Sequence, residues 1–168
     1  MSLVKGPFTI RWGLNEIEDI EEIEFEHTID SEDLETIQGR TIELDGAYKV
    51  TVILTLLASD VDALAAVLPQ HFKAMGETLS TGEEITDADG AIDVVPRECD
   101  DELVFNDLEI ISCEDPSNVL RVVNTRSKIE GIELDNKVRK VLVKFVGEAA
   151  SDQATVQFYK TGGITPVS

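Results

Sequence analysis

Apolar and polar residues alternate along much of the chain, with the period of two that is typical of β-strands. The run Phe8–Trp12 shows this pattern clearly, because three apolar residues alternate with Thr9 and Arg11. One face of such a strand is expected to be buried, with Trp12 in the core. Similar β-rich runs predict further strands at 91–95, 108–113, 119–123 and 138–146.

An acid-rich segment follows the first strand, from Glu16 to Asp30. Its apolar residues lie three, three, two and four positions apart, and steps of three also fit a helix. The β-branched content and the alternation from Ile23 to Phe25 favour a strand. The irregular spacing then predicts a β-bulge near Asp19–Glu22.

Glycines mark two changes of direction in the next region. Gln38-Gly39-Arg40 predicts a bend or turn within extended chain, whereas Asp45-Gly46 is a strong signal for a hairpin turn between 41–44 and 47–57. The strand 47–57 alternates at first and then becomes apolar on both faces. It is therefore predicted to be a central strand that is covered on both sides.

One helix is predicted after this strand. Ser59 would cap its start, and Asp62 three residues later completes a capping box. Pro69 would end the helix, since proline cannot continue it. One apolar stripe runs along the helix and consists of Val61, Leu64, Ala65 and Leu68.

These elements predict a mainly β fold, a β-sandwich or barrel with one flanking α-helix. The stretch 76–90 is rich in Thr, Gly, Glu and Asp and is expected to be a loop. Residues 1–168 are expected to form a single domain, with a flexible N-terminal arm (about 1–7) and C-terminal tail (about 161–168).

The overall charge narrows the possible partners. The 168 residues contain 34 acids and 14 bases, a net charge of −20. Binding to a nucleic-acid backbone or an anionic membrane through the overall field is therefore disfavoured. No apolar run is long enough to span a membrane, and the N-terminal residues do not have the apolar region of a secretory signal.

The charges are also segregated along the chain. Residues 16–35 contain eleven acids and no Lys or Arg, whereas 121–144 contain seven of the 14 bases and three acids. In one interpretation the acids form a solvated face and the bases pair with them inside the monomer. In the other, the acidic surface of one copy meets the basic surface of the next, which closes rings or builds stacks.

The usual signatures of catalysis and cofactor binding are missing, so we expect no enzyme, no cofactor and no metal. Asp87-Ala88-Asp89-Gly90 imitates part of a calcium loop, but the required positions fall on Ile85 and Pro96, so a turn is expected. The default role of His27 is a surface histidine among carboxylates, and that of His71 is packing or capping. Cys99 and Cys113 are expected to be small, reduced core residues, although a single disulfide between them is possible.

A longer pattern of residues resembles the major tail (tail tube) proteins of long-tailed bacteriophages. It consists of Gly39–Gly46, the strand 50–57, the helix start Ser59–Leu64 with Leu68-Pro69, the segment 90–96, and the strand from Asn136 to Phe145. The resemblance spans roughly residues 8–148. It lies in the order of the elements and contains no catalytic signature.

This resemblance implies a β-sandwich or barrel with one helix, whose subunits form rings, commonly hexameric, that stack into a tube. Inner strands of all subunits would join into one barrel around an acidic lumen through which DNA is ejected. The implied partners are further copies of the chain, a tape-measure protein, genomic DNA, and possible sheath, terminator and baseplate proteins. The implied location is the virion tail, assembled in the host cytoplasm.

Applied to this chain, the resemblance makes Glu22, Glu24 and Glu26 candidates for the lumen wall. The segment Thr28–Thr41 would be a loop that reaches a neighbour. The candidate inter-subunit contacts are Arg121, Arg126, Arg139 and Lys140. The alternatives are another ring component such as a tail terminator or baseplate protein, an acidic β module for calcium or a small ligand, and an enzyme with an unrecognised carboxylate site.

Overall fold

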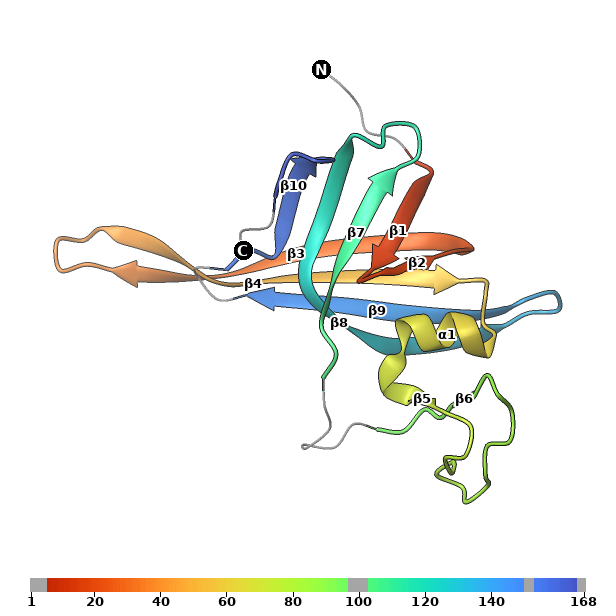
Figure 1. The fold of residues 1–168 in the computed structure, drawn as a ribbon. Helices are drawn as coiled ribbons and strands as arrows, with labels where there is room; N and C mark the ends of the chain where they lie inside the picture. The colour runs from red at the N-terminus through yellow and green to blue at the C-terminus, as the bar shows by residue number, and fades with distance from the viewer. Residues whose placement is uncertain (1–5, 97–102, 150–152, 166–168) are drawn as a thin grey trace.

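The fold is mainly β, with one α-helix in the described part of the chain, as the sequence predicts (Figure 1). The computed structural model describes residues 6–96, 103–149 and 153–165, with the backbone alone at 30–32 and 43–47. In chain order the elements are β1 (Phe8–Trp12), β2 (Asn15–Ile17), β3 (Ile20–Glu35), β4 (Thr41–Leu56), α1 (Val61–Val67), the 3-10 helix η1 (Pro69–His71), β5 (Phe72–Lys73), β6 (Ala91–Ile92), β7 (Asn106–Ser112), β8 (Asn118–Leu134), β9 (Arg139–Ala149) and β10 (Val156–Lys160).

The long strand β8 belongs to two sheets, in which neighbouring strands are antiparallel. Its first half pairs with β7 and β10, and β7 continues to β1 and β2. Its second half, from Arg126 to Leu134, pairs with β9, which continues to β4 and β3. We call the first group the five-strand sheet and the second the four-strand sheet. Figure 1 shows the strands of the two sheets crossing at a steep angle.

Polar contacts fix the point at which β8 passes from one sheet to the other. Asn124 adopts a positive φ of 54°, and its N–H donates to the Asp107 carboxylate at 2.8 Å. The next residue, Thr125, is fully buried, accepts a hydrogen bond from Trp12 Nε1 at 3.0 Å and donates one to the Asn106 carbonyl at 2.8 Å. The bend is therefore satisfied in the interior, where an unpaired polar group would be costly.

The core lies between the inner faces of the two sheets. Trp12 is buried, as predicted, and its ring meets Phe145 edge to face with 5.5 Å between centroids. Helix α1 closes the cluster through its C-terminal end. The fully buried residues of the cluster include Ile10, Leu108 and Val122 from the five-strand sheet, Val50, Val52, Leu54 and Val143 from the four-strand sheet, and Val67 and Leu68 from the helix region.

The acid-rich segment forms strands with an interruption, which confirms the predicted bulge. Strand β2 ends at Ile17, Asp19 has a φ of 56°, and β3 begins at Ile20. The pairing of β3 with β4 shifts register between Ile20 and Glu22. The Asp19 carbonyl accepts the N–H of Leu57 at 2.9 Å, which ties this corner to the end of β4.

Two predictions about the following hairpin are wrong. The segment Thr28–Thr41 is not a loop, because β3 continues to Glu35 and pairs with β4 from Thr41 onward. The turn of this hairpin lies at 37–39, which overlaps the predicted bend at 38–40, and not at Asp45-Gly46. Asp45-Gly46 instead lies at a second register shift, between the pairs Ile29–Tyr48 and Ser31–Asp45. A glycine suits such an irregularity in a ladder.

Other predictions differ in detail. The helix cap is Asp60, whose side chain accepts the Ala63 N–H at 3.2 Å, while Ser59 bonds to Arg139. The helix ends before Pro69, as predicted. Strand β4 is fully buried on its inner face, whereas on the other face Thr55 is buried and Thr51 and Ile53 are half-buried. Alternation alone did not reveal β10 or the second half of β8, where polar residues interrupt the pattern.

Candidate subunit interface on the four-strand sheet

The outer face of the four-strand sheet carries acids at one edge and bases at the other. Directly paired residues of antiparallel strands lie on the same face, so the register defines rows across the sheet. Two such rows run from β3 through β4 and β9 to β8: Glu24, Ile53, Lys144 and Lys128, and next to it Glu26, Thr51, Val146 and Arg126. The outer face is therefore charged with opposite signs at its two edges.

The acidic edge is formed by the three residues predicted to line a lumen. Glu22, Glu24 and Glu26 are exposed and alternate along β3, so they share the outer face. None of them forms an ion pair with a described residue. Strand β3 pairs with β4 along one side, and no described strand pairs with it along the other. The acids thus stand along an open strand edge.

The basic edge is formed by the second half of β8. Arg126 and Lys128 are exposed, and neither forms an ion pair with a described residue. This half of β8 pairs with β9 and with no other described strand, so its second edge is open as well. Arg126 is one of the predicted inter-subunit residues. Lys128 belongs to the same basic stretch of sequence.

The other three predicted contact residues bond within the chain. Arg121 donates to Gln157 and lies over the Tyr159 ring, 4.9 Å from its centroid. Arg139 donates to the hydroxyl and the carbonyl of Ser59, both at 2.8 Å.

Lys140 binds the Glu21 carboxylate at 2.9 Å, and this hydrogen bond raises the pKa of the lysine. Part of the basic stretch is therefore paired inside the monomer, as the first interpretation of the charge segregation proposed. Arg126 and Lys128 form no such pair with a described residue.

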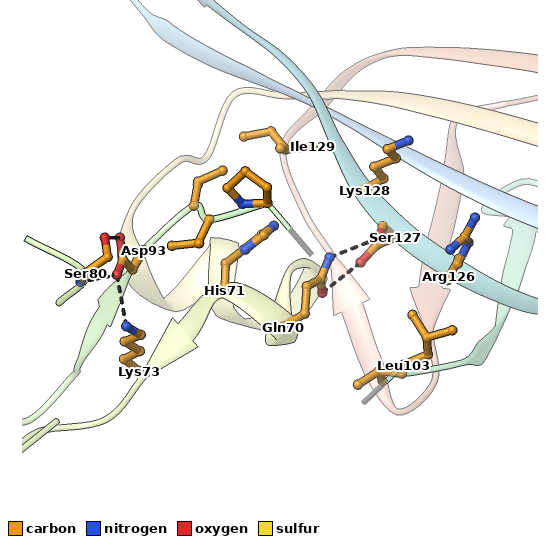
Figure 2. A pocket seen from close by; sticks show the side chains of 14 residues that line it. Gln70, His71, Lys73, Ser80, Asp93, Leu103, Arg126, Ser127, Lys128 and Ile129 are labelled. Atoms are coloured by element: carbon orange, nitrogen blue, oxygen red, sulfur yellow. Dashed lines mark hydrogen bonds and ion pairs between the residues drawn. The ribbon is translucent and has the colours of Figure 1, made fainter. Parts of the chain in front are cut away.

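A groove of about 930 Å³ lies along the open edge of β8 (Figure 2). Its β8 wall presents Arg126 and Lys128 with Ser127 and Ile129 between and after them. The opposite wall comes from the segments around η1 and β6 and from the approach to β7. Its apolar members are Val94, Val95, Pro96, Leu103 and Val104. The groove thus combines a basic rim with an apolar wall.

One side chain covers part of the β8 edge inside this groove. The Gln70 amide donates to the Ser127 carbonyl at 3.0 Å, and the Ser127 hydroxyl lies 3.5 Å from its oxygen, as the dashed lines in Figure 2 show. A carbonyl at a strand edge needs a donor when no further strand is present. Gln70 supplies this donor from η1, directly after the helix.

A second cluster holds the wall of the groove in place. The Asp93 carboxylate binds Lys73 Nζ at 3.0 Å and the Ser80 N–H and hydroxyl at 2.7 and 3.1 Å. These bonds, led by the Ser80 N–H, lower the pKa of Asp93. Burial lowers the pKa of His71 beside them, as expected for a packing residue. The oxygens of Asp93 therefore serve to hold the wall.

The remaining predicted chemical candidates have structural roles. Asp87 accepts the Asp89 N–H at 2.8 Å, so Asp87–Gly90 is the predicted turn. Gly90 is required there, since its φ is 81° and a Cβ would lie 2.4 Å from the Lys73 carbonyl oxygen. Among the described residues, no group of three or more His, Cys, Asp or Glu is placed to hold a metal ion.

The cysteine and histidine predictions have mixed outcomes. Cys113 is exposed and bonds to Thr9 at 3.2 Å, so its expected core position is wrong. Its side chain follows the end of β7, where the alternation no longer faces the core. Cys99 and its pairing lie outside the described residues. His27 is exposed, as expected, and lies 3.3 Å from the Thr155 hydroxyl.

In the described ranges, no helix has the length and apolar character needed to cross a membrane.

Gln70 and the apolar wall of the groove were not predicted from the sequence. Gln70 lies in a short segment without periodicity, and its partner Ser127 is 57 positions away. The wall is formed by exposed apolar residues at 94–96 and 103–104. Such residues give no local signal, because only the folded chain brings them next to β8.

The fold is similar to that of a chain in a solved extracellular contractile injection system. A chain of the PVC sheath-tube complex, an extracellular contractile injection system in the extended state, has a TM-score of 0.50 at 10% identity over 91% of this chain and 88% of that chain. The PVC sheath/tube terminator gives 0.49 at 11% identity over 93% and 99%, and the tube terminating cap of the anti-feeding prophage gives 0.48 at 9% identity over 90% and 96%. No protein-family model and no curated protein matches the sequence. The likeness to the sheath-tube chain supports the predicted tail-tube-like fold.

Proposed function

We propose that this chain is a ring-forming structural component of a tail-type particle and not an enzyme. The observation that carries the proposal is the pair of open, oppositely charged edges of the four-strand sheet. The fold likeness to a sheath-tube chain and the resemblance to tail tube proteins agree with it. A contact between one edge and the other is heterologous, and such contacts close into rings when their rotation allows.

The strand directions suit this contact. The four-strand sheet contains β3, β4, β9 and β8, and each pairs antiparallel with the next. With four strands, the two edges run in opposite directions. If β3 of one copy lies beside β8 of the next in a ring, the new pair is therefore antiparallel too. The sheets of all copies would join with a single type of pairing and leave no open edge.

The charges suit it as well. Glu24 and Lys128 belong to one row of the sheet, and Glu26 and Arg126 belong to the adjacent row. In a ring, the acids of one copy would meet the bases of the next at the same height. Complementary fields of this kind guide association and fix the register.

The finer role is either a stacked tube subunit or a terminator ring at the end of a tube. Rings of the first kind would build hollow filaments, whereas rings of the second kind would stay single until they meet a tube. In both, the outer face with Glu22, Glu24 and Glu26 would form the wall of the bore. Glu24 and Glu26 would meet bases at the contact, whereas the row of Glu22 contains no base, so Glu22 would keep a negative charge on this wall.

Charge reversal tests the ring. Glu24→Lys with Glu26→Lys should abolish the rings that the unaltered protein forms at high concentration, because like charges then face each other. Adding Arg126→Glu and Lys128→Glu should restore them. Sedimentation velocity and negative-stain microscopy report rings and filaments. Glu84→Lys with Glu114→Lys, which changes the charge equally at two exposed acids outside the four-strand sheet, is the matched control and should assemble normally.

Two results would contradict the proposal. The ring proposal is contradicted if the unaltered protein stays monomeric at every concentration, including when it is mixed with the other tail proteins of its source. Rings that form equally well after reversal of Glu24 and Glu26 would remove the assigned edges. Single rings without filaments would favour the terminator over the stacked subunit.

A further inference from the structure

The groove beside β8 lies where the next strand of the four-strand sheet would be added. Its floor is the open edge of β8 between Arg126 and Ile129, and its far wall is apolar. An added strand receives main-chain hydrogen bonds from such an edge, while its side chains alternate between the two faces of the sheet. The groove therefore selects for a strand with charged residues on one face and apolar residues on the other.

The chain itself contains a strand with this pattern. In β3, Glu24 and Glu26 occupy the outer face and Phe25 lies between them on the inner face. Phe25 pairs with the fully buried Val52 but keeps 43% of its surface exposed, because β3 is the edge strand. A large aromatic residue in this position is the kind of side chain that carries binding energy at interfaces.

The faces of the two strands match when β3 of a second copy is placed against β8. Arg126 and Lys128 are on the outer face of the sheet, and Ser127 is on the inner face. A β3 strand that pairs Glu24 or Glu26 with one of these bases must turn Phe25 to the inner side. There the apolar wall of the groove offers Val95 and Val104, both more than one third exposed.

We propose that the groove is the socket for β3 of a second copy, with Phe25 as its apolar anchor and Gln70 as a cap that β3 displaces. The proposal rests on the ring assembly proposed above and adds the residues that make its contact specific. In the free subunit Gln70 satisfies the Ser127 carbonyl. An incoming strand would supply a main-chain N–H in its place, so Gln70 guards the edge against unspecific pairing.

An intermolecular cross-link tests the socket directly. Both native cysteines are replaced by serine, and one preparation carries Phe25→Cys while a second carries Val104→Cys. Mixed at a concentration far more than tenfold above that at which the unaltered protein assembles, to offset the loss of the Phe25 side chain, and then oxidised, they should give a disulfide-linked dimer on a non-reducing gel, which requires Cα atoms within about 7 Å. Phe158→Cys provides the matched control in place of Phe25→Cys, since Phe158 is an aromatic residue on β10 that is 80% exposed.

Assembly measurements on two further variants complete the test. Phe25→Ala should raise the concentration needed for assembly about tenfold or more, which corresponds to the loss of one interface anchor. Phe158→Ala should leave this concentration nearly unchanged. Gln70→Ala should lower it, because the edge no longer has to lose a bond before it accepts a strand. A structural role of Gln70 alone would raise it or leave it unchanged.

The outcomes separate the socket from the ring. Rings that form without the cross-link, and that tolerate Phe25→Ala, overturn the socket but leave the ring proposal standing. A cross-link between the monomers of a preparation that forms no ring supports the socket and overturns the ring. A preparation with neither rings nor cross-link overturns both. If another acidic peptide protects Val104→Cys while a β3 peptide does not, the groove serves a different partner, which overturns the socket.

Discussion

The two long hairpins of the four-strand sheet differ in how they are supported. Figure 1 shows the end of the β3–β4 hairpin and the end of the β8–β9 hairpin pointing to opposite sides of the molecule. Beyond Tyr48, no further described strand pairs with the β3–β4 hairpin, because the described pairs of β9 with β4 run from Tyr48 to Leu56. The β8–β9 hairpin remains beside β4 almost to its turn, since Val141 pairs with Leu56.

Both ends expose apolar side chains, Leu34, Ile42 and Ile37 at the β3–β4 end and Ile132 and Leu134 at the β8–β9 end. The two ends differ in the polar contacts that hold their turns and in the strands beside them. The β8–β9 turn is fixed by Asp135, which accepts two N–H groups at 2.7 Å, and by the Lys140–Glu21 ion pair. A two-stranded hairpin with exposed apolar residues is marginal alone. The comparison shows that the first end has no third described strand beside it, whereas the second is stabilised by pairing and polar contacts within the chain.

The largest effect is expected where the β3–β4 hairpin enters the core. Leu54→Ala removes a fully buried side chain and should lower the free energy of unfolding by about 2–5 kcal/mol. Ile42→Ala, near the hairpin end, should lower it by less than about 1 kcal/mol. Urea denaturation of dilute monomer measures both. Equal losses would mean that the hairpin end is covered within the chain.

A smaller effect is expected at the turn of the β3–β4 hairpin. Gly39 has a φ of 78°, and a Cβ added there would meet no atom within 4 Å. A side chain at this position would therefore destabilise the fold through backbone strain alone and not through a steric clash. Gly39→Ala should therefore cost about 1 kcal/mol. Gly131→Ala in β8, where φ is not positive and space is also open, is the control. A cost at Gly131 as large as that at Gly39 would contradict this explanation.

The ion pair of the other hairpin should contribute less, and in a salt-dependent way. Glu21→Gln removes the partner of Lys140, and the urea midpoint should fall slightly at low ionic strength. In 1 M salt the difference should vanish, because charges at the surface are then screened within about 3 Å. Glu22→Gln, which removes a neighbouring acid without a described ion pair, should leave the midpoint unchanged.

The smallest effect is expected at low pH, on the stability of the turn between β8 and β9. Backbone N–H groups of Lys137 and Val138 lower the pKa of Asp135 below its ordinary value of 3.8. Its carboxylate therefore stabilises the folded state above pH 3.8, and this contribution is lost as the pH falls through 3.8 toward the lowered value. Amide exchange at the β8–β9 turn should increase there. The Thr36–Arg40 turn, held by a hydroxyl and backbone groups, should not respond through this mechanism.

The sequence predicted those parts of the fold that depend on local pattern. The first strand, the buried Trp12, the bulge after Asp19 and the helix end at Pro69 follow from alternation, spacing and proline chemistry. The hairpin turn was misplaced because Asp45-Gly46 has the stronger local preference. The pairing of 16 residues of β3 with 16 of β4 sets the turn at their midpoint instead, and many ladder bonds outweigh one turn preference.

The candidate interface could be predicted in part. The row of Glu22, Glu24 and Glu26 follows from alternation alone, and all three are exposed in the folded chain. Which bases bond within the chain depends on distant partners, such as Ser59 for Arg139, 80 positions away. The groove depends on segments that meet only after folding. Long-range contacts of this kind leave no trace in a local pattern.

The sharing of β8 between both sheets has a mechanical consequence. A pull on its exposed half would travel along one covalent backbone into the five-strand sheet, past the hydrogen bonds of Thr125 with Trp12 and Asn106. Load would be spread over both layers of the subunit before any side-chain contact had to yield. A particle built from such subunits would resist stretching, because strands shared by both sheets would carry the load.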